Sequence, residues 1–394
     1  MPRIGRQFTH VLILLIASLA GFLASKADHG PVDLDVYRRT GRIAIQGMDQ
    51  LYSQPYGELP FTYPPVAALF FIPFSLLPAP AFVALLTAAS LHGLWWVISS
   101  VLHVTVGQRL AIACAAPMLW ISLTFEPVTE TLSFGQVNLL LLLIIAVDLF
   151  RGGGRWRGIS LGLAMSIKLT PLIFLIYLLL AGEWRVMARA GATFLLAMVI
   201  PFVLFPRSSL EFWTHAISDP TRIGGVAYAG NQSMNGALWR LTQEGGLPLL
   251  HILLSVMVLA YAIVIQVWSE GDHRVMVCLS WALVGLLISP ISWSHHWVWT
   301  VPLCAWLATS SWHRTRQFAV PWIRSLALTL GGAWTIACVT RVIWWFPHAD
   351  DREYDQSLVV KIIADTYVVL ALLTLAFFGV LALTGSSRRS RLRL

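Results

Sequence analysis

Two carboxylates, Asp33 and Asp35, stand two positions apart just after the first long apolar run of the 394-residue sequence. A carboxylate that is partly desolvated at a membrane surface can act as a general base toward a sugar hydroxyl, and this accelerates a reaction by roughly 10²–10⁴-fold. The structural alternative is a solvated loop acid, or the cap of an amphipathic helix over residues 38–50. On spacing alone, the structural alternative is the simpler interpretation.

Amide side chains gather in two other short segments, FGQVN (134–138) and GNQSMNG (230–236). Their members are Gln136, Asn138, Asn231, Gln232 and Asn235. An amide donates and accepts hydrogen bonds at once, so such clusters suit sugar hydroxyls. The same residues also cap helices and close turns, and the sequence leaves both interpretations open.

A cation and two imidazoles lie in otherwise apolar surroundings. Lys168 lies in IKLTP, and a charge near the bilayer centre costs about 2.5–3.5 kcal/mol, so it usually faces protein or a cavity and marks function. Its alternative is snorkelling to the outer interface. His295 and His296, in SPISWSHHW, could bind phosphate, polarise a leaving group or position an acceptor. Their alternative is hydrogen bonding at the membrane interface.

Tyr63 precedes two prolines in FTYPP. Proline restricts both its own backbone and that of the residue before it, so this segment predicts a stiff, extended entry into a short helix. Tyr63 either orients its loop against a lipid or a sugar, or is an interfacial tyrosine at a helix start.

The composition indicates what positions these residues. The chain is 57% apolar and 12% charged, with a mean hydropathy of +0.72, whereas a soluble domain carries about 25% charged residues. Apolar runs recur along the chain, and a bilayer span needs about 20 residues. The net charge of +8 is divided among short clusters between these runs, which argues against nucleic-acid binding. The sequence therefore predicts an all-α, polytopic membrane protein.

We predict eleven apolar stretches, at 9–25, 81–101, 109–124, 131–150, 158–182, 190–206, 247–268, 275–290, 295–310, 321–345 and 358–384. Basic residues near span ends favour the cytoplasm. The basic clusters all fall on that side under two conditions. The stretch 61–78 must not cross the membrane once, but must be re-entrant or lie at the interface, and 158–182 must be two half-helices broken at 168–171. Prolines make both conditions plausible. The result is about twelve transmembrane helices in a single membrane domain, 1–394, with both termini cytoplasmic.

This arrangement places the polar segments on one face of the membrane. The external side receives a loop at 26–80, with juxtamembrane helices, and a loop at 207–246. Most acidic residues and all of the polar segments described above lie on or near that side. We therefore expect the chemistry to take place at the external face of the plasma membrane.

The segments DLDVY, FTYPP, FGQVN, IKLTP, GNQSMNG and SPISWSHHW, in this order, resemble the motifs of glycosyltransferase family 87 over residues 9–310. This family comprises actinobacterial mannosyltransferases with the membrane-embedded GT-C fold. The resemblance implies an inverting enzyme that moves mannose from polyprenyl-phosphate-mannose to a phosphatidylinositol mannoside in α-1,2 linkage, among membrane lipids and without a cofactor. Relatives that branch lipomannan or lipoarabinomannan share the motifs, so their acceptors remain an alternative.

The resemblance also implies roles for residues. A lipid phosphate is a good leaving group, so one base for the acceptor hydroxyl suffices, whereas glycosidases pair two carboxyls. The family's aspartate base corresponds to Asp33, with Asp35 as its competitor. The departing phosphate needs cations or hydrogen-bond donors, and the candidates are Lys168, His295, His296 and Arg240. Tyr63 and the five amides are expected to bind the donor. No acidic cluster predicts a metal site.

A transporter or lipid flippase is the alternative from another functional class. Transporters favour internal repeats and a binding site at the midplane, between broken helices. The predicted break at 168–171 fits a transporter, but the sequence shows no repeat and its polar residues crowd one face. A purely structural membrane scaffold fits poorly with so many clustered amides and histidines.

Overall fold

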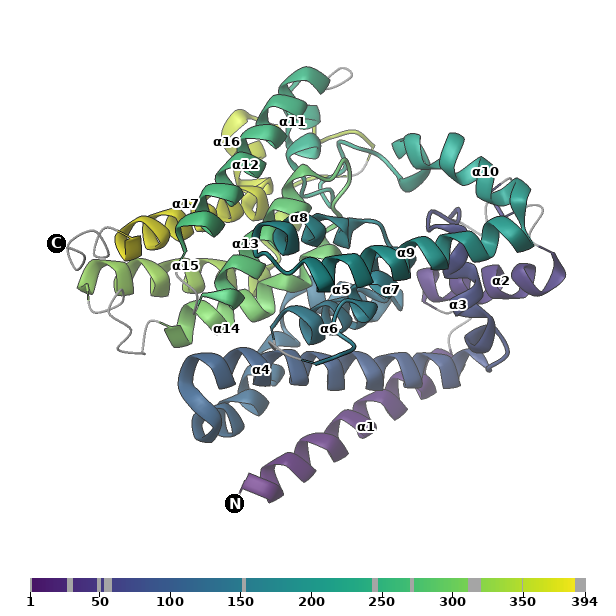
Figure 1. The fold of residues 1–394 in the computed structure, drawn as a ribbon, viewed down its shortest axis with the longest axis horizontal. Helices are drawn as coiled ribbons and strands as arrows, with labels where there is room; N and C mark the ends of the chain where they lie inside the picture. Colours follow the sequence, from purple (N-terminus) through teal and green to yellow (C-terminus); the bar gives the residue numbers. More distant parts are fainter. Residues whose placement is uncertain are drawn as a thin grey trace.

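The computed structural model describes residues 2–26, 31–47, 51–52, 59–150, 154–242, 247–269, 273–310, 320–348 and 350–386. Within these ranges the regular elements are α-helices and short 3-10 helices, and an isolated β-bridge joins Asn231 and Trp293. The predicted all-α fold is confirmed. Figure 1 shows the helices packed around α5, α6, α7 and α13, with α1 lying along α4 at one edge.

Five helices of the described ranges are long and apolar enough to cross a membrane. They are α4 (Ala79–Ser122), α9 (Trp184–Leu204), α12 (Pro248–Trp268), α15 (Pro321–Thr340) and α17 (Thr366–Ser386). A sixth span is possible if α5 (Glu126–Phe134) and α6 (Asn138–Leu149), which meet at an angle of 116°, are counted as one. Shorter apolar helices include α1 (Pro2–Lys26), α3 (Pro65–Ser75) and α13 (Arg274–Ile288). The chain is therefore a multi-pass membrane protein.

Two predicted spans, 81–101 and 109–124, are the two parts of α4. A straight helix of these 44 residues would be about 66 Å long, more than twice the thickness of the hydrocarbon core. Gly107 interrupts the helix with φ 76° and ψ 168°, a conformation that residues with a side chain rarely adopt. The ribbon of α4 bends sharply at its left end in Figure 1.

The predicted break in 158–182 is confirmed. α7 (Ile159–Ile167) ends where Lys168 takes an extended conformation, and the short 3-10 helix η1 (Thr170–Leu172) leads into α8 (Ile173–Leu180). Proline at position 171 lacks an N–H and clashes with the preceding turn, which favours a break or a kink in the helix before it. Both half-helices are too short to cross a bilayer alone.

Three predicted boundaries were wrong. The stretch 131–150 is not one helix, because α5 begins at Glu126 and the chain turns at 135–137 before α6. The stretch 295–310 opens with the 3-10 helix η4 (Ser294–Trp299), and α14 (Thr300–Ser310) follows. The stretch 358–384 is divided at Asp365 into α16 (Leu358–Ala364) and α17. In each case a run of uniform apolarity hid a change of backbone direction.

The segments that connect the long helices contain short helices of their own. The segment 26–80 holds α2 (Val32–Gln46) and α3, which pack on each other, and 207–246 holds most of α10 (Pro206–Thr214) and all of α11 (Met234–Thr242). Figure 1 places α2, α3 and α10 at the right, where α1 ends, whereas the start of α1 and the end of α17 lie toward the left. The amphipathic helix over 38–50, which the sequence analysis considered as the structural alternative for Asp33, begins at Val32 instead, so Asp33 lies in its first turn. Residues 48–50 lie outside the described residues.

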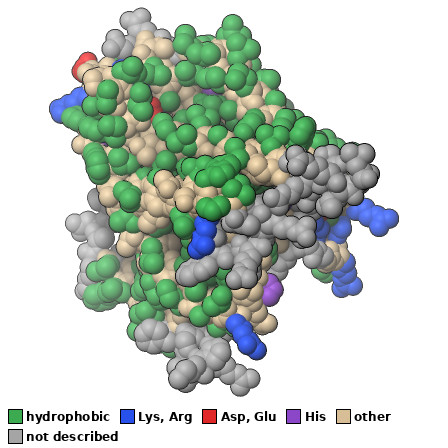
Figure 2. All heavy atoms as spheres, turned by 90° about the vertical axis from the view of Figure 1, so that its left-hand side faces the viewer, with side chains coloured by type: hydrophobic (Ala, Val, Ile, Leu, Met, Phe, Trp, Pro, Cys, Tyr) green, Lys and Arg blue, Asp and Glu red, His purple; other side chains and the backbone are tan. Residues whose placement is uncertain are grey.

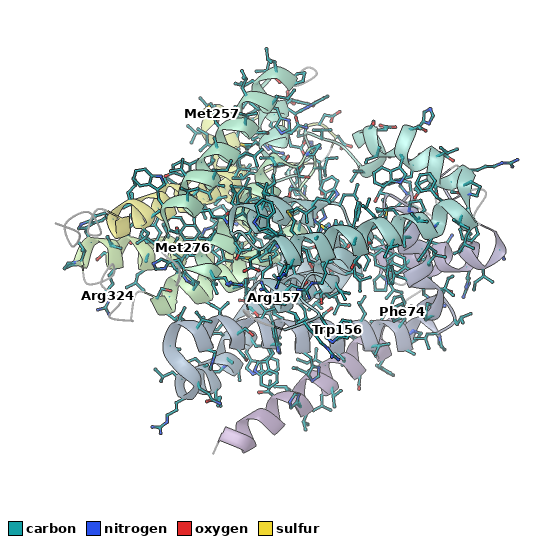
Figure 3. All side chains as sticks on the ribbon, viewed as in Figure 1. Phe74, Trp156, Arg157, Met257, Met276 and Arg324 are labelled. Atoms are coloured by element: carbon teal, nitrogen blue, oxygen red, sulfur yellow. The ribbon has the colours of Figure 1, made fainter. Side chains whose placement is uncertain are left out.

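The surface of the long helices is apolar, as a lipid-facing surface must be. In the 18-residue apolar window of α12, 11% of residues are buried within the protein. Met257 projects from α12 at the outer edge of the molecule (Figure 3), and it is 65% exposed. Figure 2 shows hydrophobic side chains over most of one face, with Lys and Arg in a few separate places.

Candidate active site

A cavity of about 890 Å³ opens between α2, the 59–64 segment, the break after α7, the 216–230 loop and the 289–296 segment. Six of the residues singled out in the sequence line it. They are Asp33, Tyr63, Gln136, Lys168, His295 and His296. Three segments that are distant in the sequence thus supply one carboxylate, one ammonium group and two imidazoles to the same space.

Asp33 lies in the first turn of α2, a helix that is not among those long enough to cross a membrane. Burial raises the pKa of its carboxyl from the ordinary 3.8 to about 6, while a hydrogen bond from Gln136 and the positive charge of Lys168 act in the opposite direction. A base is most effective when its pKa lies near the working pH, because it is then ionised yet still basic. The surroundings of Asp33 therefore suit proton removal near neutral pH.

Gln136 is fixed by two tyrosines. The hydroxyls of Tyr37 and Tyr63 donate to its side-chain oxygen over 2.8 and 3.0 Å, and they lie 2.9 Å from each other. Because the oxygen already accepts two hydrogen bonds, the amide nitrogen is left to donate to Asp33. The sequence analysis quoted Tyr37 within DLDVY but gave it no role.

Gly135 allows α2 to approach Gln136 this closely. It has φ 69°, and a Cβ at this position would lie 2.7 Å from the Cβ of Leu34. A side chain here would therefore push α2, and Asp33 with it, away from the turn between α5 and α6.

Asp35 does not line the cavity. Residues two apart in a helix point about 200° from each other, and the Asp35 carboxylate pairs with Arg39 over 2.7 Å on a partly exposed side of α2. The structure thus separates the two carboxylates that the sequence placed together.

Lys168 is held at the break between α7 and η1. Its ammonium donates to Oδ1 of Asn138 over 3.1 Å and to Nε2 of His296 over 2.9 Å, and it lies 5.7 Å from the centre of the Tyr63 ring. An ammonium group has no acceptor, so this Nε2 is the unprotonated nitrogen of the imidazole. Asn138 and His296 thus hold the charge of Lys168 at the wall of the cavity.

His295 is fixed through its backbone. Its carbonyl oxygen accepts hydrogen bonds from Thr131 and Asn138, each over 3.0 Å. The ring packs edge-on against Phe134 and His296, and its Nε2 has no hydrogen-bond partner among the described residues. The histidine pair is therefore positioned by α5 and α6, although it follows them by more than 140 residues in the sequence.

The second amide segment lies behind the cavity wall. Asn231 joins the backbone of Val226 to that of Ser292, and Gln232 donates to two backbone oxygens, those of Ala229 and Ala364. Asn235 donates to the carbonyl of Pro290 over 3.2 Å. These three amides bind protein backbone and do not line the cavity. Their contacts hold the 226–236 segment against the 289–294 segment.

Arg240 is also part of this support. It is fully buried, forms an ion pair with Asp365, and donates to the carbonyls of Ala227, Tyr228 and Asn231. All of these partners are protein groups, and Arg240 does not line the cavity. The structure therefore separates it from Lys168 and the histidine pair.

The sequence analysis missed other parts of the site. Arg222, Tyr228, Trp293 and Trp344 line the same cavity. Glu126 is fully buried behind it and accepts hydrogen bonds from Trp344 Nε1 and the Tyr367 hydroxyl, each over 3.0 Å. Glu126 and Trp344 are separated by more than 200 residues, so local spacing carried no signal for this contact. In the described residues no three His, Cys, Asp or Glu side chains gather as metal ligands do.

Comparison with known proteins identifies relatives of this chain. The model of glycosyltransferase family 87 matches residues 61–290. The chain is 36% identical, over 92% of both chains, to the polyprenol-phosphate-mannose-dependent alpha-(1-2)-phosphatidylinositol mannoside mannosyltransferase of Mycobacterium tuberculosis. It is 33% identical to the protein of the same name from Mycolicibacterium smegmatis, over 91% of this chain and 84% of that protein.

A third relative, also from Mycolicibacterium smegmatis, is a polyprenol-phosphate-mannose-dependent alpha-(1-2)-phosphatidylinositol pentamannoside mannosyltransferase. It is 32% identical, over 79% of this chain and 78% of that protein. No solved structure matches the chain. The extent of these matches and the ordered motifs lead to one conclusion: the chain is a member of glycosyltransferase family 87.

Proposed function

We propose that this protein is an inverting mannosyltransferase, which moves mannose from polyprenyl-phosphate-mannose to a phosphatidylinositol mannoside in α-1,2 linkage. The observation that carries this proposal is the meeting of Asp33 and Lys168 in one cavity, with a general base and a cation available to a single bound pair of substrates. The names of the three relatives support both the donor and the acceptor class.

In the proposed reaction, Asp33 removes the proton of the acceptor hydroxyl as its oxygen bonds to the anomeric carbon of the donor mannose. The bond from that carbon to the phosphate oxygen breaks, and its electron pair leaves with the polyprenyl phosphate. Lys168 and His296 stabilise the charge that develops on this phosphate. Attack from the face opposite the leaving group inverts the anomeric carbon. A phosphate leaves without being protonated, so the step needs no acid partner for Asp33.

We propose that the start of the donor's lipid chain lies beside this phosphate position. A second, smaller cavity of about 60 Å³ shares Lys168 and His296 with the large one, and Asn138 also lines it. Its remaining walls are mostly apolar side chains of α6, α8 and α13, among them Leu142, Phe174 and Leu286. An apolar wall beside the cation suits the first isoprenyl carbons of a lipid phosphate.

The architecture in this proposal is of the GT-C type, with about twelve transmembrane helices and the cavity at the external face of the plasma membrane. The distribution of basic residues supports the orientation. The two parts of α4, the broken α7–α8 pair and the shorter apolar helices supply spans beyond the five long ones.

Purified protein provides the test. We expect it to transfer labelled mannose from a synthetic polyprenyl-phosphate-mannose to a phosphatidylinositol mannoside with no second protein present, and to yield an α-1,2 linkage by NMR. A purified and folded protein that moves lipids across vesicles but transfers no mannose would refute the proposal in favour of a flippase. If the protein transfers mannose to lipomannan but to no phosphatidylinositol mannoside, the proposed reaction is correct and the proposed acceptor is wrong.

A further inference from the structure

Three arginines and two tryptophans gather where α7 and α9 begin. We call these residues the basic patch: Arg155, Trp156, Trp184, Arg185 and Arg189. α7 starts at Ile159, just after the first two of them, and it ends at Ile167, next to Lys168 in the wall of the large cavity. The basic patch therefore lies at the end of α7 that points away from the cavity, and it has no part in the reaction proposed above.

The basic patch is built from two segments that are packed tightly together. α7 packs along α9 (Figure 1). Gly158 has φ 98°, and a Cβ at this position would collide with the carbonyl oxygen of Val186. The Arg189 guanidinium donates to the backbone carbonyl of Arg155, and its Nε donates to that of Arg185 over 3.1 Å. These contacts hold the arginines of both segments on one surface.

The positive charge of this surface is not neutralised within the described part of the chain. The two carboxylates near it have other partners. Asp148 is buried and accepts from two backbone N–H groups at the start of α7, while Glu183 pairs with Arg157 over 2.6 Å and with Arg274 over 2.7 Å. None of the ion pairs in the described ranges includes an arginine of the basic patch. Two of these arginines lie one turn apart on α9, where like charges repel.

The two tryptophans indicate where this surface lies relative to the membrane. Trp156, labelled in Figure 3, is 64% exposed, and Trp184 is 58% exposed. The Arg155 guanidinium lies 4.9 Å from the centre of the Trp156 ring. Tryptophan rings favour the boundary between membrane and water, at the level of the lipid headgroups. The uncompensated arginines are therefore placed at the depth of lipid phosphates.

We infer that the basic patch binds the headgroup phosphate of an anionic phospholipid, in the leaflet at this end of the molecule. Guanidinium groups form charge-assisted, often bidentate hydrogen bonds with phosphate oxygens. A net negative lipid relieves the repulsion among the arginines, whereas a zwitterionic lipid brings a positive charge of its own to the same surface. Basic clusters beside membrane helices are known to bind anionic lipids in this way. The competing explanation is that these arginines only orient the helices during insertion, and it predicts no preference between lipids.

Thermal stability of the purified protein in detergent separates these cases. The Tm is measured with added phosphatidylglycerol, and separately with phosphatidylcholine of the same acyl chains at the same mole fraction. A ligand that binds the folded state alone raises its stability, and we expect the Tm of the wild type to be higher in phosphatidylglycerol by about 3 °C. Arg155→Gln/Arg185→Gln should abolish this difference. The double variant leaves Arg189 and its hydrogen bonds to the backbone in place.

The matched control is Arg109→Gln/Arg324→Gln. Both of these arginines are exposed and lie outside the basic patch, so the control removes the same charge and should keep the wild-type difference in Tm. Inorganic phosphate, added at the same concentration as the lipid, should not reproduce the gain. If the double variant of the basic patch does not fold, Arg185→Gln alone tests the inference and should reduce the difference by about half.

Three results would each overturn the inference. The wild type could have the same Tm in both lipids, or the control variant could lose the difference as fully as the variant of the basic patch. Inorganic phosphate could also raise the Tm as much as phosphatidylglycerol does, which would mean that the surface binds a free anion. None of these measurements depends on mannose transfer, so the inference and the proposed function fail or stand separately.

Discussion

The Nζ atom of Lys168 lies 2.9 Å from Nε2 of His296, across 128 residues of sequence. The lysine comes from a broken helix and the histidine from a 3-10 segment. Asn138 joins the two segments, because it accepts from Lys168 and donates to the backbone carbonyl of His295, the residue before His296. Neither segment could hold this geometry alone. The arrangement keeps a cation and an imidazole side by side at the wall of the cavity. A phosphate oxygen that binds there can accept a hydrogen bond from Lys168 in place of the imidazole nitrogen.

Removal of either member should impair use of the donor. We expect Lys168→Ala, and separately His296→Ala, to lower kcat/KM for polyprenyl-phosphate-mannose by at least about tenfold, or about 1.4 kcal/mol of transition-state stabilisation. His296→Gln retains a side chain that can accept from Lys168 and should lose less. His92→Ala, at the contact between α4 and α1, is the control away from the cavity. Normal donor kinetics in both alanine variants would show that the two residues are structural.

The raised pKa of Asp33 predicts a pH profile. The base must be ionised, and burial raises its pKa to about 6, so kcat/KM should fall as the pH decreases through this value. The profile is measured with saturating donor and a neutral acceptor, so that the acceptor does not titrate. If kcat/KM falls only near pH 4, where an ordinary carboxyl titrates, Asp33 is not the group that controls the rate.

The same pKa predicts an effect on stability. Because the folded-state pKa lies above the unfolded value of 3.8, the contribution of Asp33 is fully favourable below pH 3.8 and is lost as the pH rises through 6. Asp33→Asn has no charge to bury, so its Tm in detergent should exceed that of the wild type, by more at pH 7.5 than at pH 4.5. An equal difference at both values would contradict the burial of this carboxyl.

The proposed orientation can be tested with single cysteines, in a background from which the four native cysteines have been removed. Asn231 is fully buried and makes a poor probe, and Gly153 lies outside the described residues. Ser218 and Asp351 are exposed, and we expect cysteines there to react with an impermeant reagent in intact cells. A cysteine at Arg155, also exposed, should react after lysis alone. Labelling at Arg155 in intact cells would reverse the orientation and move the cavity to the cytoplasm.

What the sequence could predict depended on how local each signal was. The break at Lys168–Pro171 was predictable, since proline chemistry acts on its own turn. Six residues that share the cavity were found in the sequence. Lys168 stands out against apolar neighbours, whereas the role of Asp33 came from the resemblance to the family. Arg240 stands out equally, and nothing in its segment showed that Asp365 would neutralise it.

Other features depended on contacts between distant residues. Tyr37, Glu126 and Trp344 take their roles from partners 99 to 241 positions away, and a single sequence holds no information on such pairs. The turn at Gly135 had a local signal, a glycine followed by a polar residue inside an apolar stretch. Uniform hydropathy over 131–150 outweighed this signal and led to the error.

The last prediction concerns the base itself. Asp33→Asn keeps the size of the side chain and an oxygen that can accept the hydrogen bond from Gln136, but an amide cannot take a proton from the acceptor hydroxyl. Expression and donor binding should therefore persist, while kcat falls by roughly 10²–10⁴-fold, the usual contribution of a general base.

Asp35→Asn is the matched control, because it makes the same chemical change two residues away. The helix turns Asp35 out of the cavity and toward Arg39, so its substitution removes one partly exposed ion pair, which is worth at most about 1 kcal/mol. We expect kcat close to the wild-type value. Both variants are assayed with saturating donor and acceptor, since a loss confined to KM would indicate a binding role. An inactive Asp35 variant beside an active Asp33 variant would transfer the role of base to Asp35 and require α2 to rotate when substrates bind. Full activity in both would show that neither carboxylate removes the proton.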